Sequence, residues 1–204
     1  MLEFHKSNGG IATISLWEVE DPSRFGVADY VEDTGKILRF QEKPKIEDAF
    51  SNLINAGTYL LEHDIFDMMP EGAHSMERDV YEKIAKYGSL NGFPFEGMFV
   101  DAGTPSSFIE ASQACISSQR YSSGTELENS WFGKDSHCLG EIAGSSLGPT
   151  ATVAEGCMVQ NSVILEGASI GENSHLEGCL IGKGAIISKG TVLSGQIVNH
   201  SLSE

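Results

Sequence analysis

The chain has 204 residues, enough for one large or two small domains with a substantial buried core. Its 13 lysine and arginine residues stand against 29 acidic residues, a formal net charge of -16 that argues against nucleic acid or an anionic membrane surface as a partner. The first residues contain no apolar signal segment, and no apolar run approaches membrane-spanning length, so we expect a cytoplasmic protein.

The first hundred residues predict a mixture of strands and helices. Residues 1–7 are typical of the end of a helix, and Ile11–Trp17 is a continuous β-prone run of the kind found in buried strands of a mostly parallel sheet. Two further helices are predicted over residues 62–69 and 76–87. Ser75 stands where it can cap the second of them.

Two short motifs place polar groups at the ends of predicted strands. They are F-Q-E-K-P over Phe40–Pro44 and I-N-A-G-T-Y over Ile54–Tyr59. A carboxylate such as Glu42 can accept hydrogen bonds from sugar hydroxyls, a lysine such as Lys43 can neutralise a phosphate, and an amide beside bare glycine backbone can close on a small polar ligand. On residue types alone, a solvated Glu42–Lys43 pair and an ordinary turn at Asn55–Gly57 are the simpler interpretation.

A third motif, D-A-G-T-P over Asp101–Pro105, follows a strand-like run. An aspartate just before a helix is most often an N-terminal cap. Here Thr104 can supply that cap with Pro105 at the first helical position, which leaves the Asp101 carboxylate free for another role. The helix itself is predicted from about residue 106 to residue 117.

The sequence becomes periodic beyond a polar segment, residues 118–138, that we interpret as a linker. Large aliphatic residues recur at steps of six, six and five, so the pattern repeats every 17 residues. The aliphatic positions are Leu147, Val153, Val159, Ile164, Ile170, Leu176, Ile181, Ile187, Leu193 and Val198. Small residues recur at Ala151, Ala168 and Ala185, and turn residues at Gly156, Asn173 and Gly190. Such repetition predicts a three-sided solenoid with a narrow interior.

Taken in order, the three motifs resemble the second half of the catalytic domain of the sugar-1-phosphate nucleotidyltransferases, also called NDP-sugar pyrophosphorylases. The periodic segment resembles the hexapeptide repeat of the left-handed β-helix. The resemblance implies an α/β fold, a partial Rossmann-like nucleotidyltransferase domain over residues 1–117, followed by an all-β left-handed parallel β-helix over residues 139–204. Ser75–Asp79 is more similar to mannose-1-phosphate guanylyltransferases than to adenylyl or thymidylyl relatives, which hints at the substrate.

In enzymes of that family, an oxygen of a sugar 1-phosphate attacks the α-phosphorus of a nucleoside triphosphate and pyrophosphate leaves. Such chemistry depends mainly on positioning and charge neutralisation. By the resemblance, Lys43 holds the sugar phosphate as a catalytic residue and Glu42 binds sugar hydroxyls. Gly26, within an F-G-V run similar to the family's Y-G-V, would shape the sugar pocket together with Asn55 and Gly57.

The resemblance also makes Asp101 a catalytic residue, one of two aspartates that hold Mg²⁺. The other aspartate is absent from this sequence, as is the family's G-x-G-T-R-L-x-P nucleotide signature with its downstream lysine. We therefore expect that the chain alone makes no nucleotide sugar, and that it is the C-terminal part of a longer enzyme or one piece of a split enzyme. Its expected partners are a sugar 1-phosphate, a nucleoside triphosphate, and either further copies of itself or a completing nucleotide-binding segment. A sheet without its earlier strands predicts an unpaired apolar edge.

Two other functions stay open. Many hexapeptide-repeat proteins are acyltransferases with a catalytic histidine, and His175 lies within the clear repeats. The chain could instead be a non-catalytic regulatory or scaffold subunit of a nucleotidyltransferase, with the β-helix mediating assembly. The four cysteines show no zinc-binding or disulfide spacing, so we expect free thiols, with Cys157 and Cys179 as small core fillers.

Overall fold

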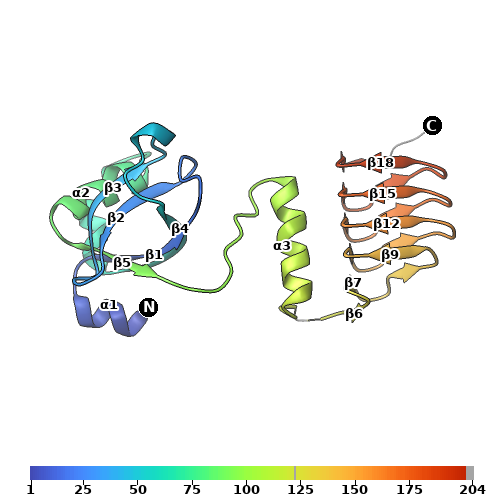
Figure 1. The fold of residues 1–204 in the computed structure, drawn as a ribbon, viewed down its shortest axis with the longest axis horizontal. Coiled ribbons are helices and arrows are strands. Elements are labelled where there is room, and N and C mark those ends of the chain that lie inside the picture. Colours follow the sequence, from blue (N-terminus) through green and yellow to red (C-terminus); the bar gives the residue numbers. More distant parts are fainter. Residues whose placement is uncertain (122, 201–204) are drawn as a thin grey trace. The chain divides into compact units, whose positions relative to one another are not determined.

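The computed structural model describes residues 1–121 and 123–200, and the chain divides into two compact units, Met1–Phe99 and Val100–Glu204. Figure 1 shows the elements of the two units as ribbons, and each unit has its own hydrophobic core. Within the described ranges, none of the helices combines the length and the apolar character needed to cross a bilayer. The order expected from the sequence, a part with mixed strands and helices followed by a β-helix, is confirmed.

The first unit is built on a five-stranded barrel. Its elements in chain order are α1 (Leu2–Asn8), β1 (Ala12–Glu18), β2 (Gly26–Val31), β3 (Lys36–Glu42), η1 (Ile46–Asp48), β4 (Leu53–Leu61), η2 (His63–Met68), η3 (Met76–Tyr81), α2 (Glu82–Lys86) and β5 (Leu90–Pro94). The strands close in the order β1-β4-β2-β3-β5. β1 runs antiparallel to β4 and parallel to β5, and the remaining pairs are antiparallel.

This barrel corrects two expectations. The sheet is not mostly parallel, because β1 and β5 form its single parallel pair. β1 is nevertheless buried on both sides: Ala12, Ile14 and Leu16 face the core, while Thr13 and Ser15 are covered from the other side. The barrel closes on itself, so the expected unpaired apolar edge is not found within residues 1–99.

The helical segments after β4 differ from the prediction in type rather than in place. η2 is a 3₁₀ helix inside the predicted range 62–69. The helix predicted over residues 76–87 begins as a π-helix, η3, and continues as α2. Ser75 caps it as expected, since Ser75 Oγ accepts a hydrogen bond from Arg78 N at 3.3 Å. Its apolar stripe, Val80, Tyr81, Ile84 and Ala85, is buried in the core of the unit.

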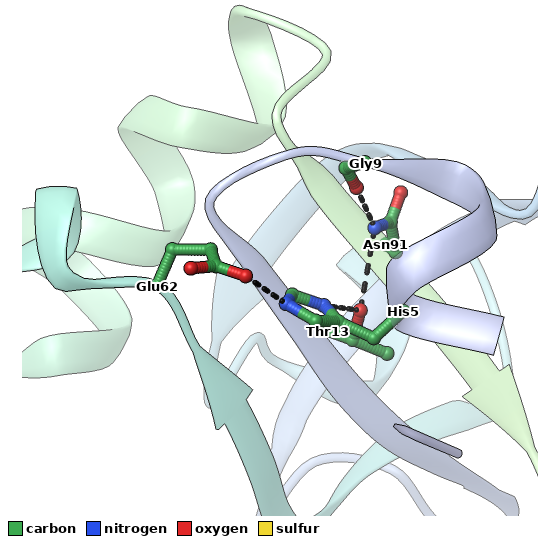
Figure 2. Close-up of polar contacts among 5 residues, drawn as sticks. All are labelled: His5, Gly9, Thr13, Glu62 and Asn91. Carbon is green, nitrogen blue, oxygen red and sulfur yellow. Dashed lines mark hydrogen bonds and ion pairs between the residues drawn. The ribbon is translucent and has the colours of Figure 1, made fainter. Parts of the chain in front are cut away.

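A partly buried polar network ties α1 to the barrel (Figure 2). Asn91 Nδ2 donates to the Gly9 carbonyl and, at 3.2 Å, to Thr13 Oγ1. His5 lies 2.7 Å from Thr13 Oγ1 through Nδ1 and 3.1 Å from Glu62 Oε1 through Nε2. Because a carboxylate only accepts, Nε2 carries the His5 proton and the Thr13 hydroxyl donates to Nδ1. Thr13 has no exposed surface, so this Glu–His–Thr chain stabilises the fold and offers no accessible nucleophile.

The second unit is a helix packed on a three-sided parallel β-helix (Figure 1). Its elements are α3 (Pro105–Ser117), β6 (Thr125–Leu127), β7 (Ser130–Phe132), β8 (His137–Cys138), β9 (Glu141–Ala143), β10 (Ser146–Leu147), β11 (Thr152–Val153), β12 (Met158–Gln160), β13 (Val163–Ile164), β14 (Ser169–Ile170), β15 (His175–Glu177), β16 (Leu180–Ile181), β17 (Ile186–Ile187), β18 (Val192–Ser194) and β19 (Ile197–Val198). The sheets run β19-β16-β13-β10-β7-β6, β17-β14-β11-β8 and β18-β15-β12-β9. Ser112 on α3 donates to Ser146 Oγ at 3.0 Å, which fixes the helix on the first sheet.

The predicted repeat of 17 residues is confirmed. Partner residues in adjacent coils, such as Ser146 and Val163, are 17 positions apart. The inward aliphatic residues Leu147, Ile164 and Ile181 are fully buried in one column of the core. The predicted turn positions are confirmed as well. Gly156, Asn173 and Gly190 have positive φ values of 72, 56 and 70°, as expected for turns. The solenoid therefore follows directly from the spacing of aliphatic and turn residues.

The boundary between the two units, after Phe99, lies before the end of the predicted first domain at residue 117. α3 ends the predicted first domain, 1–117, but belongs to the second unit. The predicted linker, 118–138, contains β6, β7 and β8, and the last two pair with β10 and β11 of the β-helix. These strands have two or three residues each, too short to stand out from polar surroundings. Position 122 and the end of the predicted β-helix range, 201–204, lie outside the described residues.

One corner of the β-helix carries a ladder of buried hydroxyl groups. Ser162 Oγ accepts a hydrogen bond from Cys179 N at 2.9 Å and donates to the Gln160 carbonyl at 2.7 Å. One coil earlier, Ser145 Oγ accepts from Ser162 N at 2.9 Å. Each buried backbone N–H at this corner is thus satisfied by a side chain of the preceding coil.

Replacing Ser162 by alanine is expected to destabilise the second unit by about 1–3 kcal/mol, because the buried N–H of Cys179 loses its acceptor. Urea unfolding followed through Trp131 fluorescence measures the loss. Ser162→Cys is the matched control, since Cys179 occupies the same column one coil later and bonds the Glu177 carbonyl; this variant should lose less. Equal stability of Ser162→Ala and the parent chain would show that the ladder is unimportant.

Candidate functional site

The F-Q-E-K-P motif ends β3 and turns sharply at Lys43. Lys43 has a positive φ of 47°, and its backbone N–H donates to the Phe25 carbonyl at 2.9 Å, which holds the turn against the start of β2. The Lys43 ammonium is exposed and lies 3.5 Å from Glu42 Oε1. Glu42 is largely covered, with 12% of its side chain exposed. An exposed cation therefore stands beside a largely covered carboxylate.

Gly26 is the partner of Glu42 in the β2–β3 pair. A Cβ atom at this position would lie 2.3 Å from Phe40 Cζ and 3.0 Å from Glu42 Oε2. Any side chain at this position would clash with Phe40, so glycine lets Phe40 and Glu42 pack against the bare backbone of β2. Glu82 Oε1 on α2 also accepts from Glu42 N at 3.3 Å, fixing the strand end.

The I-N-A-G-T-Y motif forms a bulge in β4. The register between β1 and β4 shifts here, from Ile14 opposite Tyr59 to Leu16 opposite Asn55. Gly57 adopts a φ of 79°, and its N–H donates to Asn55 Oδ1 at 3.0 Å. Asn55 Nδ2 donates to Tyr59 Oη at 3.0 Å. The amide of Asn55 is thus held at both ends, and it orients the Tyr59 hydroxyl.

Aromatic rings join the two motifs. Tyr81, from η3, packs on Tyr59 of β4 with ring centroids 5.7 Å apart and on Phe40 of β3 at 5.9 Å. Gly26, Glu42, Lys43, Asn55 and Gly57 all lie in the first unit, and the tyrosine pair links the strands that carry the two motifs. The sequence interpretation missed the pair and its neighbour Glu77, although Tyr59 belongs to the quoted motif.

Two carboxylates influence the tyrosine pair. Burial raises the pKa of Tyr59, the hydrogen bond from Asn55 lowers it, and the charges of Glu77 and Glu42 raise it further. Burial also raises the pKa of Tyr81, with smaller contributions from Tyr59 and Glu77. Both tyrosines therefore stay neutral at neutral pH.

Alkaline pH is expected to destabilise the first unit through Tyr81. Since the pKa of Tyr81 is raised above its ordinary value of 10.0, the folded state keeps its proton while the unfolded state loses it, and stability falls as pH rises above about 10. Tyr81→Phe should change stability little at pH 7 and make this alkaline loss shallower. Urea unfolding followed through Trp17 fluorescence between pH 8 and about 11 measures it; an unchanged slope would contradict this assignment.

Asp101 lies in the second unit, before α3. Thr104 Oγ1 accepts from Ser107 N at 3.2 Å and Pro105 begins the helix, so Thr104 is the cap, as predicted. The Asp101 carboxylate is exposed and makes no hydrogen bond to another described residue. Within the described ranges, no group of three or more His, Cys, Asp or Glu side chains could hold a metal ion. The described residues therefore do not form a complete Mg²⁺ site.

His175 lies on β15, on the outer surface of the β-helix, and is exposed. In the part of the chain that the structure describes, its imidazole has no hydrogen-bond or ion-pair partner that would orient it as a base. The four cysteines are free, as expected, and Cys157 and Cys179 are buried in the β-helix core.

Comparison with protein-family models assigns both parts of the chain. Residues 1–118 match the model described as "Nucleotidyl transferase", and residues 104–197 match "GlmU-like, C-terminal hexapeptide". The first match covers more than half of the chain. The chain therefore belongs to the nucleotidyl transferase family.

The relatives found are similar along most of the chain. It is 33% identical over 203 residues to mannose-1-phosphate guanylyltransferase 1 of Arabidopsis thaliana, covering 98% of this chain and 54% of the relative. A probable mannose-1-phosphate guanylyltransferase 1 of Oryza sativa is 31% identical with the same coverage. The mannose-1-phosphate guanylyltransferase catalytic subunit beta of Dictyostelium discoideum is 38% identical over 109 residues, 53% of this chain and 30% of the relative. The chain thus spans about half the length of the plant relatives.

Proposed function

We propose that the chain carries the sugar-phosphate side of a sugar-1-phosphate nucleotidyltransferase, which forms an NDP-sugar and pyrophosphate from a nucleoside triphosphate and a sugar 1-phosphate. The observation that carries the proposal is the pairing of a covered carboxylate, Glu42, with an exposed ammonium, Lys43, at 3.5 Å. A sugar 1-phosphate presents hydroxyl donors and a dianionic phosphate, the groups that this pair complements.

Each predicted residue has a chemical part in this proposal. Lys43 neutralises the phosphate and lowers the cost of bringing it near another anion during transfer. Glu42 accepts hydrogen bonds from sugar hydroxyls, and Gly26, which has no side chain, lets the Glu42 side chain lie against the β2 backbone. Asn55 and Gly57 offer a fixed amide and bare backbone to the sugar. The names of the relatives favour mannose 1-phosphate and GTP as substrates.

The nucleotide side of the site is not assigned to residues of this sequence. The G-x-G-T-R-L-x-P signature does not occur in it, so we propose that further residues, from a completing segment or another polypeptide, hold the triphosphate. Mg²⁺ held in part by Asp101, a homo-oligomeric state and a cytoplasmic location belong to the same proposal. Mg²⁺, when bound, would neutralise phosphate charge.

Pyrophosphate release tests the proposal for the whole reaction. The purified chain is incubated with mannose 1-phosphate or glucose 1-phosphate, each of GTP, ATP, dTTP and UTP, and Mg²⁺. We expect no release from this chain alone with any pairing. Release that is lost in Lys43→Met and in Asp101→Ala would show that residues of this sequence hold the nucleotide after all.

A further inference from the structure

A third polar element, η3, meets the site next to the Glu42–Lys43 pair. Glu77 is partly buried and stands four residues before Tyr81 on this helix, so the two side chains lie on one side of it. Tyr81 packs on Tyr59, whose pKa is raised by the charges of both Glu77 and Glu42. η3 also packs against β3, the strand that ends at Glu42, so the two carboxylates lie on neighbouring segments of the unit.

The Glu77 carboxylate is oriented by its own helix start. Ser75 Oγ donates to Glu77 Oε2 at 2.8 Å, and Ser75 N donates to Asp79 Oδ2 at 2.8 Å. Among the described residues, Oε1 of Glu77 has no hydrogen-bond partner and can accept from a ligand. η3 is a π-helix, a wide turn that recurs at functional sites because it redirects side chains.

We infer that Glu77 is a second sugar-binding carboxylate. It accepts a hydrogen bond from a ring hydroxyl of a hexose 1-phosphate, and this hydroxyl is one that Glu42 does not reach. The inference rests on the proposed function and adds a specificity-determining residue to it. Because β3 and η3 fix Glu42 and Glu77 independently, the two acceptors can select the configuration of the hexose, since a misplaced hydroxyl would leave one carboxylate unpaired.

The test is isothermal titration of the purified chain with mannose 1-phosphate, glucose 1-phosphate and inorganic phosphate. Glu77→Gln keeps the size of the side chain and an oxygen for Ser75 but removes the charge. We expect this variant to weaken the binding of mannose 1-phosphate about tenfold. The binding of inorganic phosphate should stay unchanged or become slightly tighter, because a nearby negative charge is lost. Glu3→Gln, an exposed position on α1, is the matched control and should bind like the parent chain.

The three ligands separate the possible results. If Glu77 acted only through its charge, it would weaken the binding of both anions, and Glu77→Gln would tighten the binding of both. This result would overturn the inference. Equal loss for sugar phosphate and inorganic phosphate would indicate a disturbed fold and would also overturn it. If the parent chain does not bind mannose 1-phosphate, or if Lys43→Met binds it equally well, the proposed function itself fails. If Lys43→Met weakens the binding of mannose 1-phosphate but Glu77→Gln does not, the inference about Glu77 fails and the proposed function stands.

Discussion

Lys43→Met is expected to weaken the binding of mannose 1-phosphate by about 10- to 100-fold. The substitution keeps an unbranched side chain of similar length and removes the ammonium that stands 3.5 Å from Glu42. A hydrogen bond to a charged group contributes about 1.5–3 kcal/mol, and each 1.4 kcal/mol changes affinity tenfold. Without the cation, the phosphate would also approach the negative charge of Glu42 uncompensated.

The matched control is Lys45→Met, two residues along the same turn. Lys45 is exposed and lies 4.0 Å from Glu47, outside the strand end that carries Glu42. Isothermal titration should give Lys45→Met an affinity within about twofold of the parent chain, as expected for loss of a screened surface charge. Equal losses in the two variants would mean that phosphate is attracted by the general charge of this surface, and would contradict a specific role for Lys43.

Ile164→Ala is expected to destabilise the second unit by about 2–5 kcal/mol. Ile164 is fully buried on β13, between the coils that contribute Leu147 and Ile181 to the same core column. Each coil of a solenoid contacts only its neighbours, so a cavity at this level weakens both interfaces of the coil. Urea unfolding followed through Trp131 fluorescence in a Trp17→Phe background measures the change in the second unit.

Ile186→Ala supplies the comparison on a neighbouring coil. Ile186 is 55% exposed, and removal of its side chain should change stability by less than about 0.5 kcal/mol. A loss for Ile164→Ala as small as that for Ile186→Ala would contradict the assignment of Ile164 to a packed interior.

The β-helix could be predicted from sequence because its register is local. A step of 17 residues places like residues in one column, and both the buried aliphatic positions and the left-handed turn at Asn173 follow from that spacing. The short strands β7 and β8 could not be recognised in the same way. They lie in a polar stretch, and their place is fixed by pairing with β10 and β11 in the next coil.

The barrel of the first unit was predicted less well, because its pairing is not local. The run Ile11–Trp17 contains alternating apolar and hydroxyl residues, and its hydroxyl face is buried only because His5 and the β4 backbone cover Thr13 and Ser15. No single-sequence pattern announces those contacts. The expectation of a parallel sheet therefore failed although the position of β1 was predicted correctly.

The residues of the candidate site were predicted from motifs, and their assigned roles stay predictions. Gly26 lies opposite Glu42, next to Lys43, because β2 and β3 are paired. Asn55 and Gly57 lie in a bulge of β4, which a glycine within a strand favours. Glu77 could not be recognised from the sequence, because its proposed role depends on η3 packing beside β3 and β4. η3 begins more than thirty residues after the end of β3, so no local pattern predicts this contact.

Chemical-shift mapping of mannose 1-phosphate on the ¹⁵N-labelled chain tests the central claim most directly. The account predicts that saturable shifts concentrate at the backbone amides of Gly26, Glu42, Lys43, Asn55 and Gly57, and that the amides around His175 stay unchanged. Shifts centred on His175, or no shifts at millimolar ligand while the spectrum shows a folded chain, would contradict a sugar-phosphate site at the end of β3.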